Sequence, residues 1–350
     1  MALSTPRASA ILAGSTSSHD PGQRLRELIQ HGHSNLPLPG RGRTLERWSA
    51  LAAVAAEDLS LVKLFEGHTD AIAILAEARQ PDVIDEIDDS AAYGMWAAEA
   101  PGARVLFRST AQDTVALVGS KAWCSGAAAL NRALLTVWPE QAPAAGEASE
   151  GPWLADVDLR QPGVVIDDSR WRAVGMAETV SATVTFESAS ARLIGPAGFY
   201  LSRPGFWHGG IGVAACWHGA ACAIAQSLRT QLRAAGSEAA WHRALALGEV
   251  DRLLSANAAL LREAAAWVDR HPEDDARAWA LRTRAASDEC AQQVLRATMR
   301  AMGAGPLCHD EGFARKAADL PVFIRQCHGD RDLVALGHAL LQQKDMPWTL

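Results

Sequence analysis

A long apolar segment near the middle of the chain restricts the possible folds more than any other feature. Residues 207–234 form a nearly continuous apolar helical pattern that contains Gly209, Gly210, Gly212 and Gly219. A helix that is apolar on every side has to be buried. Its glycines have no side chain beyond a hydrogen, so neighbouring helices can approach closely. We therefore expect this segment to be the central helix of a bundle.

Further helical patterns follow this segment to the end of the chain. The first covers residues 239–268, and the next covers 275–302 and stops at a Gly-rich turn. The last is expected to begin near Asp319 or Pro321 and to run into Gln343. Helices joined by short loops pack as antiparallel neighbours. The sequence thus predicts a C-terminal four-helix bundle over residues 204–350.

The N-terminal part of the chain also has a helical period. One amphipathic helix is expected over residues 44–58, and another begins at Asp58 and ends at a break around Gly67. A third covers residues 71–79 and ends before a proline. Residues 1–20 are rich in Ser, Thr and Gly, so we expect them to be partly disordered. Residues 1–91 are therefore predicted to form a small helical domain.

The period changes to that of strands between residues 92 and 203. Short β-branched or alternating runs are separated here by Gly, Pro, Asp or Ser, which is typical of an antiparallel sheet or barrel. The Ala-, Glu- and Pro-rich residues 139–152 are expected to form a mobile surface loop within it. Six strands are predicted, over residues 103–107, 114–118, 133–138, 153–159, 164–167 and 182–187. The fold class is therefore α+β, with a helical domain, a β domain and a helical bundle in that order.

Composition excludes several classes of function. The chain carries 33 basic and 40 acidic residues and has a formal net charge of −7, which argues against a nucleic-acid partner. No uninterrupted apolar run reaches the ~18 residues that a membrane span needs, and the apolar patch at residues 8–14 is too weak for a signal peptide. The six cysteines form no CxxC pair, so we expect buried free thiols in a reducing cytoplasm. The neighbouring His309, Asp310 and Glu311 do not predict a metal site, because adjacent side chains do not converge on one ion.

The segment Gly119–Ala127 is the strongest candidate for a ligand site. It lies between two predicted strands and places Trp123, Ser125 and Gly126 within four positions. One interpretation is a strand with a packed Trp that turns at Gly126. In the other, Trp123 offers a flat face and Ser125 a hydrogen-bonding group to a planar ligand. The local pattern leaves both interpretations open.

The order of domains and one motif resemble the acyl-CoA dehydrogenases, over about residues 40–342. Members of that family carry a Gly-x-Lys-x-Trp/Phe-Ile-Thr/Ser segment, and Gly119-Ser120-Lys121-Ala122-Trp123-Cys124-Ser125 is similar to it. The resemblance implies an FAD cofactor. It also implies that Trp123 packs against the flavin ring and that Ser125 forms a hydrogen bond near flavin N5.

Two further segments are weaker matches to the family. Trp96-Ala97-Ala98-Glu99-Ala100-Pro101-Gly102 loosely resembles the family's loop over the flavin, which would make Trp96 and Glu99 cofactor-binding. Met302-Gly303-Ala304-Gly305 is similar to a Gly-rich turn that approaches the FAD of a neighbouring subunit, although a helix C-cap is the simpler interpretation. The family's Arg-containing phosphate segment is not recognisable, and Arg243 is the residue that would substitute for it.

The family's catalytic base is missing from its usual place. Cys327-His328-Gly329-Asp330 resembles a Tyr-Glu-Gly-Thr segment, so His328 stands where the family has Glu. A His has a suitable pKa for a base, and on one continuous helix Asp332 and Arg325 would share its face. Asp332 would then orient His328. The alternative is a solvated helix face with weak ion pairs. His208 and His218 lie on the apolar helix, where a core position and a ligand contact both remain open.

The resemblance implies an FAD-dependent oxidoreductase that dehydrogenates an acyl thioester by proton abstraction and hydride transfer to flavin N5. The partners would be an acyl-CoA or related carbonyl substrate, an electron-transfer flavoprotein or oxygen as electron acceptor, and further copies of the chain in a homodimer or homotetramer. One alternative is a flavin-dependent monooxygenase, because members that activate oxygen often lack the Glu. A second alternative is a non-catalytic member with a binding or assembly role.

Overall fold

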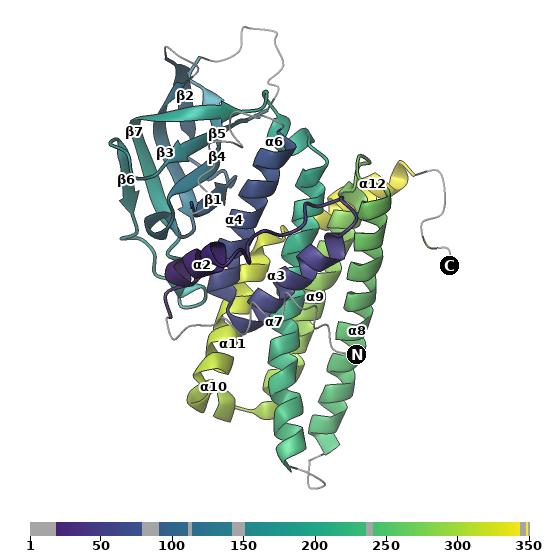
Figure 1. The fold of residues 1–350 in the computed structure, drawn as a ribbon. Helices are drawn as coiled ribbons and strands as arrows, with labels where there is room; N and C mark the ends of the chain where they lie inside the picture. Colours follow the sequence, from purple (N-terminus) through teal and green to yellow (C-terminus); the bar gives the residue numbers. More distant parts are fainter. Residues whose placement is uncertain are drawn as a thin grey trace.

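The computed structural model describes residues 19–78, 91–110, 114–141, 151–235, 241–343 and 348. The predictions for the first 18 residues and for the loop at 142–150 lie outside this part of the chain. The β domain lies at one end of a long helical bundle, and helix α4 separates the sheet from the bundle (Figure 1). The predicted fold class is confirmed.

The N-terminal region contains the helices α2 (Pro21–Gln30), α3 (Thr44–Glu57) and α4 (Leu59–Glu77). The break predicted around Gly67 is wrong, because α4 continues through it as one helix of 19 residues. A glycine inside a helix costs only about 1 kcal/mol, and the long buried face of α4 outweighs that preference. The helix begins at Asp58, whose side chain accepts a hydrogen bond from the Leu61 backbone N–H at 2.8 Å.

The β domain contains seven strands among the described residues, one more than predicted. Pairings in the order β4-β2-β3-β7-β5 and back to β4 close a ring, with β1 added to β4 and β6 added to β7. The pairs β1–β4 and β2–β4 are parallel, so the sheet is mixed rather than purely antiparallel. The strands are β1 (Tyr93–Trp96), β2 (Val105–Ser109), β3 (Val115–Cys124), β4 (Arg132–Pro139), β5 (Trp153–Asp158), β6 (Val164–Asp167) and β7 (Ala182–Ile194).

Strand β1 is the one that the sequence pattern missed. It has four residues, includes Gly94, and follows residues outside the described part of the chain. Its position is fixed from outside the strand, because His68 of α4 accepts the Tyr93 backbone N–H at its Nδ1 atom, 3.2 Å away. The pairing with β4 is also long-range, and a local pattern contains no signal for it.

The helical bundle is built around α7 (Gly205–Ala235), which follows the short helix α6 (Phe199–Ser202). Helix α7 packs against α3, α4, α8 (Trp241–Arg270) and α9 (Arg277–Met302), so it is central, as predicted. A Cβ atom on Gly219 would overlap the Ala52 backbone of α3. The glycine is therefore required by the close approach of the two helices.

Helix α7 is also long and apolar enough, by length and composition, to cross a membrane. Among the described residues it is the one helix that meets this test, over Gly205–Ala234. The expectation from the sequence concerned apolar runs, whereas this test also accepts a helix that contains some polar and charged residues. In the bundle, 72% of the apolar window is buried against other helices, as in the core helix of a bundle.

The C-terminal region differs from the single last helix that was predicted. It consists of α10 (Gly305–His309), α11 (Glu311–Phe323), a 3-10 turn (Ile324–Gln326) and α12 (Asp330–Leu341). The start at Asp319 or Pro321 is wrong, because Asp310 caps α11 by accepting the Phe313 backbone N–H at 3.0 Å. The helical path breaks between α11 and α12, where Gly329 has a φ of +57°.

Candidate cofactor site

The end of strand β3 presents Trp123 to solvent in an unusual backbone conformation. Trp123 has a φ of +63°, a region that few residues other than glycine adopt. The register between β3 and β7 shifts between Lys121 and Cys124, so Trp123 sits in a bulge. Bulges redirect single side chains, and here the indole ring is 60% exposed. The packed-Trp interpretation is therefore wrong for this residue.

Ser125 follows Trp123 and is held by a second strained segment. Its Oγ lies 2.7 Å from the Oγ of Ser181, and the Gly126 backbone N–H donates to the Thr179 carbonyl at 2.7 Å. Val180, between these two partners, has a φ of +38°, which is costly for a β-branched residue. Positive φ values in non-glycine residues thus occur on both sides of Ser125. Such strain persists only where the surroundings enforce it, and it is concentrated at functional sites.

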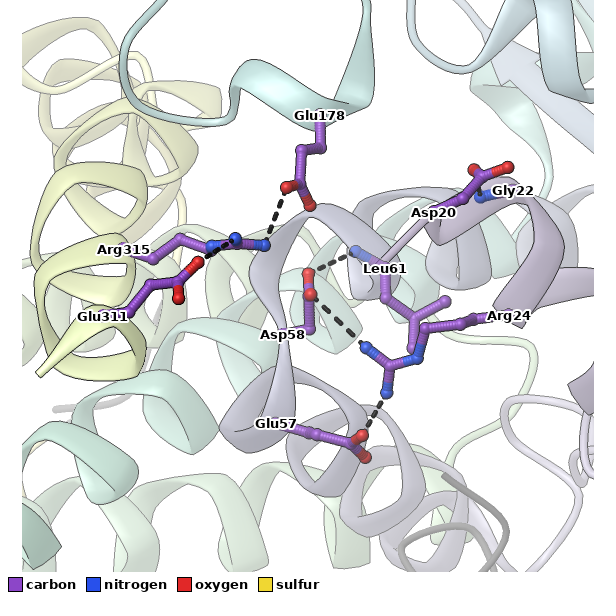
Figure 2. A network of polar contacts seen from close by, with 9 residues as sticks. All are labelled: Asp20, Gly22, Arg24, Glu57, Asp58, Leu61, Glu178, Glu311 and Arg315. Atoms are coloured by element: carbon purple, nitrogen blue, oxygen red, sulfur yellow. Dashed lines mark hydrogen bonds and ion pairs between the residues drawn. The ribbon is translucent and has the colours of Figure 1, made fainter. Parts of the chain in front are cut away.

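Side chains of helix α11 hold this strained segment in place from the side of the bundle. Asp319, which is buried, accepts the Met176 backbone N–H at 2.6 Å. Arg315 forms ion pairs with Glu178 at 2.7 Å and with Glu311 at 3.0 Å (Figure 2). These contacts fix the segment that carries the partners of Ser125.

The start of α4 is fixed by a second polar cluster in the same region. Arg24 of α2 forms ion pairs with Glu57 and Asp58 (Figure 2). Asp58 is also the cap of α4, so the cluster sets where that helix begins. Helix α4 then runs past Trp123 and Ser125 and forms the opposite wall of the site.

A cavity of about 20 Å³ lies between α4 and the β domain. Three residues predicted to bind the cofactor, Trp96, Trp123 and Ser125, line it together. The other lining residues could not be predicted from the sequence, because nothing in a helical period indicates which face of α4 meets a distant strand. These residues are Lys63, Leu64, Gly67, Gly94, Met95 and Leu130.

Lys63 is the one cationic side chain among the residues that line this cavity. Its Nζ atom lies 3.5 Å from the Oε2 atom of Glu66, and the side chains are 19% and 13% exposed. Burial raises the pKa of Glu66, an effect that the Lys63 ammonium opposes. The i,i+3 spacing of the pair was the only sequence signal, and it is also typical of solvated helix faces.

The enclosed cavity is too small for a flavin, whereas the exposed face of Trp123 beside it is open. A cavity of about 20 Å³ has room for about one water molecule, far less than a flavin ring. The Trp96 indole lies across Gly94, and its Nε1 donates to the Ser125 carbonyl at 3.4 Å, so it occupies the inner space. The exposed face of Trp123, next to Ser125, is where a planar ring fits. The residues therefore suit a flavin stacked on an open wall.

Glu99 has its contacts inside the β domain. It accepts hydrogen bonds from Lys121 at 2.7 Å and from the Thr136 hydroxyl at 2.6 Å. Lys121 is fully buried, which lowers its pKa, while Glu99 raises it. An unpaired buried ammonium would be very unfavourable, so Glu99 compensates this charge. Glu99 does not line the cavity, and its contact with a cofactor stays a prediction.

Arg243, Gly303 and Gly305 come together at a different place, the end of α9. The Arg243 Nε donates to the Ala301 carbonyl at 3.3 Å. Gly303 ends α9 with a φ of +70°, and Gly305 begins α10. This is the arrangement of a helix C-cap with a cation at the negative end of the helix dipole. None of the three lines the cavity, and their role toward a neighbouring subunit stays a prediction.

His328 lies in the break between α11 and α12, so the predicted helix face with Arg325 does not exist. Asp332 nevertheless contacts His328, with Oδ1 3.4 Å from Nδ1 and Oδ2 accepting the His328 backbone N–H at 3.1 Å. Arg325 instead pairs with Asp288 at 3.2 Å. The His328 side chain is 69% exposed, and neither His328 nor Asp332 lines the cavity.

His218 belongs to the core of the bundle. Its Nδ1 lies 3.1 Å from the Asn257 Nδ2, and Ser287 donates to the Asn257 Oδ1 at 2.9 Å. Burial lowers the pKa of His218 to about 4. It faces α8 and α9 through these contacts, and the structure favours the core interpretation.

The remaining candidate ligands do not form a metal site. Within the described ranges, no group of three or more His, Cys, Asp or Glu side chains is arranged to hold a metal ion. All six cysteines are free thiols, but the expectation that they are buried is wrong for Cys308, which is exposed, and for Cys222, which is partly exposed.

No protein-family model and no curated protein matches the chain. Solved structures do match it. FMN-bound TdsC from Paenibacillus sp. A11-2, a dibenzothiophene monooxygenase, is 19% identical, with a TM-score of 0.77 over 97% of this chain and 94% of that one. A nitrososynthase from Micromonospora carbonacea var. africana is 19% identical, with a TM-score of 0.79 over 97% and 98%. Butyryl-CoA dehydrogenase from Megasphaera elsdenii is 15% identical, with a TM-score of 0.77 over 98% and 100%.

These likenesses extend over nearly the whole chain, including both helical regions and the β domain. The chain therefore has the acyl-CoA dehydrogenase fold. At these identities the comparison defines the fold alone, so the reaction has to be argued from the site.

Proposed function

We propose that this chain is a flavin-dependent oxidoreductase that acts as a monooxygenase on a small organic substrate. The observation that carries the proposal is the exposed Trp123, held at a φ of +63° in a bulge beside Ser125. A strained, exposed aromatic residue weakens a fold unless it binds something. The wall suits a planar ring, and TdsC, which has the same fold, binds FMN.

The chain's own residues have separable roles at this wall. Trp123 stacks on the flavin ring, and the Ser125 hydroxyl, positioned by Ser181, forms a hydrogen bond at its edge. Lys63 places a positive charge on the α4 side, where it tunes the electronics of the ring. A bound flavin supplies hydride transfer and, once reduced, reacts with oxygen. FMN is the simpler fit, because the family's phosphate segment is not recognisable in the sequence and Arg243 does not line the cavity.

The loss of the carboxylate base favours oxygen chemistry over dehydrogenation. A dehydrogenase needs a base beside the α-carbon of its substrate. His328 occupies the place where the resemblance expects that base, yet it is largely exposed and does not line the cavity. Oxygen chemistry does not require α-proton abstraction, so an exposed His328 is compatible with it.

Acyl-thioester dehydrogenation is a second candidate because of Glu66. This carboxyl group is largely but not fully buried, its pKa is raised by burial, and its partner Lys63 lines the cavity. A carboxyl group with a raised pKa is suited to general acid–base catalysis near neutral pH. Glu66 does not itself line the cavity, so in this version of the reaction it would have to act through its partner Lys63, which does.

Flavin titration followed by two reaction assays tests these proposals. FMN and FAD are titrated separately into the purified chain, and binding is followed by quenching of flavin fluorescence. The monooxygenase predicts substrate-dependent oxygen uptake when reduced flavin is supplied, with unchanged rates in Glu66→Gln. The dehydrogenase predicts anaerobic bleaching of the bound flavin by acyl-CoA esters, and at least a hundredfold loss in Glu66→Gln. If neither flavin binds, both proposals fail and the non-catalytic alternative stands.

We also propose that the chain assembles as a homodimer or homotetramer. The proposal is supported by Trp241 and Leu245, which are 77% and 61% exposed on the first turns of α8, beside Arg243 and the end of α9. Light scattering after size exclusion measures the mass directly. A monomer at micromolar concentration would contradict the proposal.

A further inference from the structure

The C-terminal end of α4 lies near α6 (Figure 1). A second and larger cavity lies there, lined by residues of α4, the α6–α7 corner and the start of α7. Its volume is about 260 Å³, compared with about 20 Å³ for the first cavity. Helix α4 lines it with Ala73, Ala76 and Glu77, whereas Lys63 and Gly67 line the flavin wall. Ten residues along a helix correspond to about 15 Å, so the two sites are separate.

Most walls of this cavity are apolar. They come from four segments that are distant in the sequence, namely the loop before α3, α4, the α6–α7 corner and the turn between α8 and α9. The apolar side chains include Leu38, Pro39, Phe199, Pro204 and Pro272. A cavity with apolar walls and a few polar groups is the usual form of a small-molecule site.

Arg203 is one of the polar groups that line the cavity, and it is only 5% exposed. Its Nη1 atom pairs with Glu77 at 2.8 Å, and its Nη2 atom lies 3.7 Å from the Oδ1 of Asp70. These carboxylates compensate the guanidinium charge. The Nε–H group is nevertheless buried with no hydrogen-bond partner. A buried donor without a partner is unfavourable, so this N–H is available to a bound molecule.

His208 is the second polar group, and it is 1% exposed. The Nδ1 edge of its ring lies against Gly40, where an added Cβ atom would be 3.3 Å away. The Nε2 atom is buried and has no partner. Burial is the main cause that lowers the pKa of His208, so the ring is neutral at pH 7. A neutral ring nitrogen can accept a hydrogen bond from a hydroxyl group.

We infer that this cavity binds a small neutral molecule with an apolar body and one hydroxyl group, such as a single-ring phenol. The hydroxyl oxygen accepts from the Arg203 Nε–H, and the hydroxyl proton is donated to the His208 Nε2. One group with both a donor and an acceptor satisfies both buried atoms. The site does not depend on the proposed flavin chemistry, because it shares no lining residue with the flavin wall.

Charged ligands fit this arrangement less well. A carboxylate would meet the Glu77 carboxylate beside Arg203, and burying like charges together is unfavourable. An ammonium group has three donors and no acceptor, so it cannot satisfy the Arg203 Nε–H. The rim carries both signs of charge, Arg41 and Glu273, and does not favour either class.

Fluorine NMR with the full chain tests this inference. The probe is 4-fluorophenol, and the matched control is 4-fluoroanisole, which has the same ring but no hydroxyl proton. The phenol is expected to bind at least tenfold more tightly, because the anisole cannot donate to the His208 Nε2. Ala76→Phe, which fills the cavity, is expected to abolish phenol binding and to leave flavin binding unchanged.

Two further variants separate this site from the flavin wall. His208→Leu is expected to remove the preference for the phenol over the anisole, with circular dichroism confirming that the variant folds. Trp123→Ala is expected to leave phenol binding unchanged. Equal affinity for the two probes, no detectable binding of either, or binding that survives Ala76→Phe would each overturn the inference. The last two results would mean that water alone satisfies Arg203 and His208, or that the phenol binds elsewhere.

Discussion

The resemblance expects the flavin at the corner around Ser125, formed by residues 123–126 and 176–181, and the base at the break around His328. These two regions differ in how firmly the rest of the structure holds them. The corner combines positive φ values at Trp123 and Val180 with buried anchors such as Asp319. The break is exposed, and Asp332 is the main side chain that contacts His328. Backbone strain that distant elements hold in place is typical of functional sites, whereas an exposed loop with few contacts carries no such signal.

The largest expected difference between the two regions concerns a matched pair of glycines. Gly126 has a φ of +71°, and a Cβ atom there would lie 2.5 Å from Leu64 Cδ2. Gly329 has a φ of +57°, with nothing within 4 Å of an added Cβ. Gly126, with a ψ of +12°, is in the left-handed helical region, where alanine costs about 1–2 kcal/mol, and overpacking adds about 1–3 kcal/mol. Gly329, with a ψ of −121°, is outside that region, and its alanine variant loses about 1–3 kcal/mol from backbone strain alone. Urea denaturation measures both values.

Equal losses in Gly126→Ala and Gly329→Ala would contradict the contrast between a tight corner and a loose break. A smaller loss in Gly126→Ala would contradict it more strongly. Leu64 lines the cavity, so Gly126→Ala is also expected to weaken flavin binding, while Gly329→Ala is not.

The next effect concerns the link between α4 and β1. Burial, helped by Arg47, lowers the pKa of His68 from 6.5 to about 4, and its neutral Nδ1 accepts the Tyr93 N–H. A depressed pKa contributes stability above pH 6.5 that is lost as the pH falls toward 4. The difference corresponds to about 3 kcal/mol at most. The free energy of unfolding of the wild type should therefore fall more steeply over this range than that of His68→Asn, whose amide oxygen can accept the same N–H.

Denaturation curves at several pH values between 6.5 and 4 give the comparison directly. His218 titrates in the same range, but it is present in both proteins, so its effect cancels in the difference. Parallel pH dependences in the wild type and in His68→Asn would show that His68 is not a buried neutral group.

The smallest expected effect is that of His328 on stability. Its side chain is 69% exposed, and its contact with Asp332 is a surface pair. His328→Asn should change the free energy of unfolding by less than about 0.5 kcal/mol. If His328 acts only from an exposed loop, turnover with reduced flavin should also change by less than about threefold. A loss of a hundredfold or more, measured by oxygen uptake, would restore His328 as the catalytic base.

The sequence predicted the order of domains and the central position of α7, because both depend on periodicity and on apolar surface. It also brought Trp96, Trp123 and Ser125 into one site through a motif. It did not predict Lys63, since the face of α4 that meets the strand depends on long-range packing. It placed Arg325 and His328 on one helix face because no local signal marked the break before Gly329.

The strained corner itself could not be predicted. Nothing about the sequence of Met176 or Val180 indicates a positive φ, and both conformations depend on contacts with α11 and the Ser125 turn. The second cavity was hidden for the same reason. Its walls come from four segments that only the fold brings together. Motifs thus identified the residues that we propose to bind a ring, and tertiary contacts determine how these residues are held in place.

The most direct test of the central claim compares the wild type with Trp123→Gly in two measurements on the same preparations. Glycine relieves the positive φ, so the free energy of unfolding should rise by up to about 1 kcal/mol. The same change removes the stacking face, so FMN affinity measured by fluorescence quenching should fall at least tenfold. Higher stability with weaker flavin binding is the result that the proposed role of Trp123 predicts. Unchanged FMN affinity in Trp123→Gly, or no FMN binding by the wild type, would contradict it.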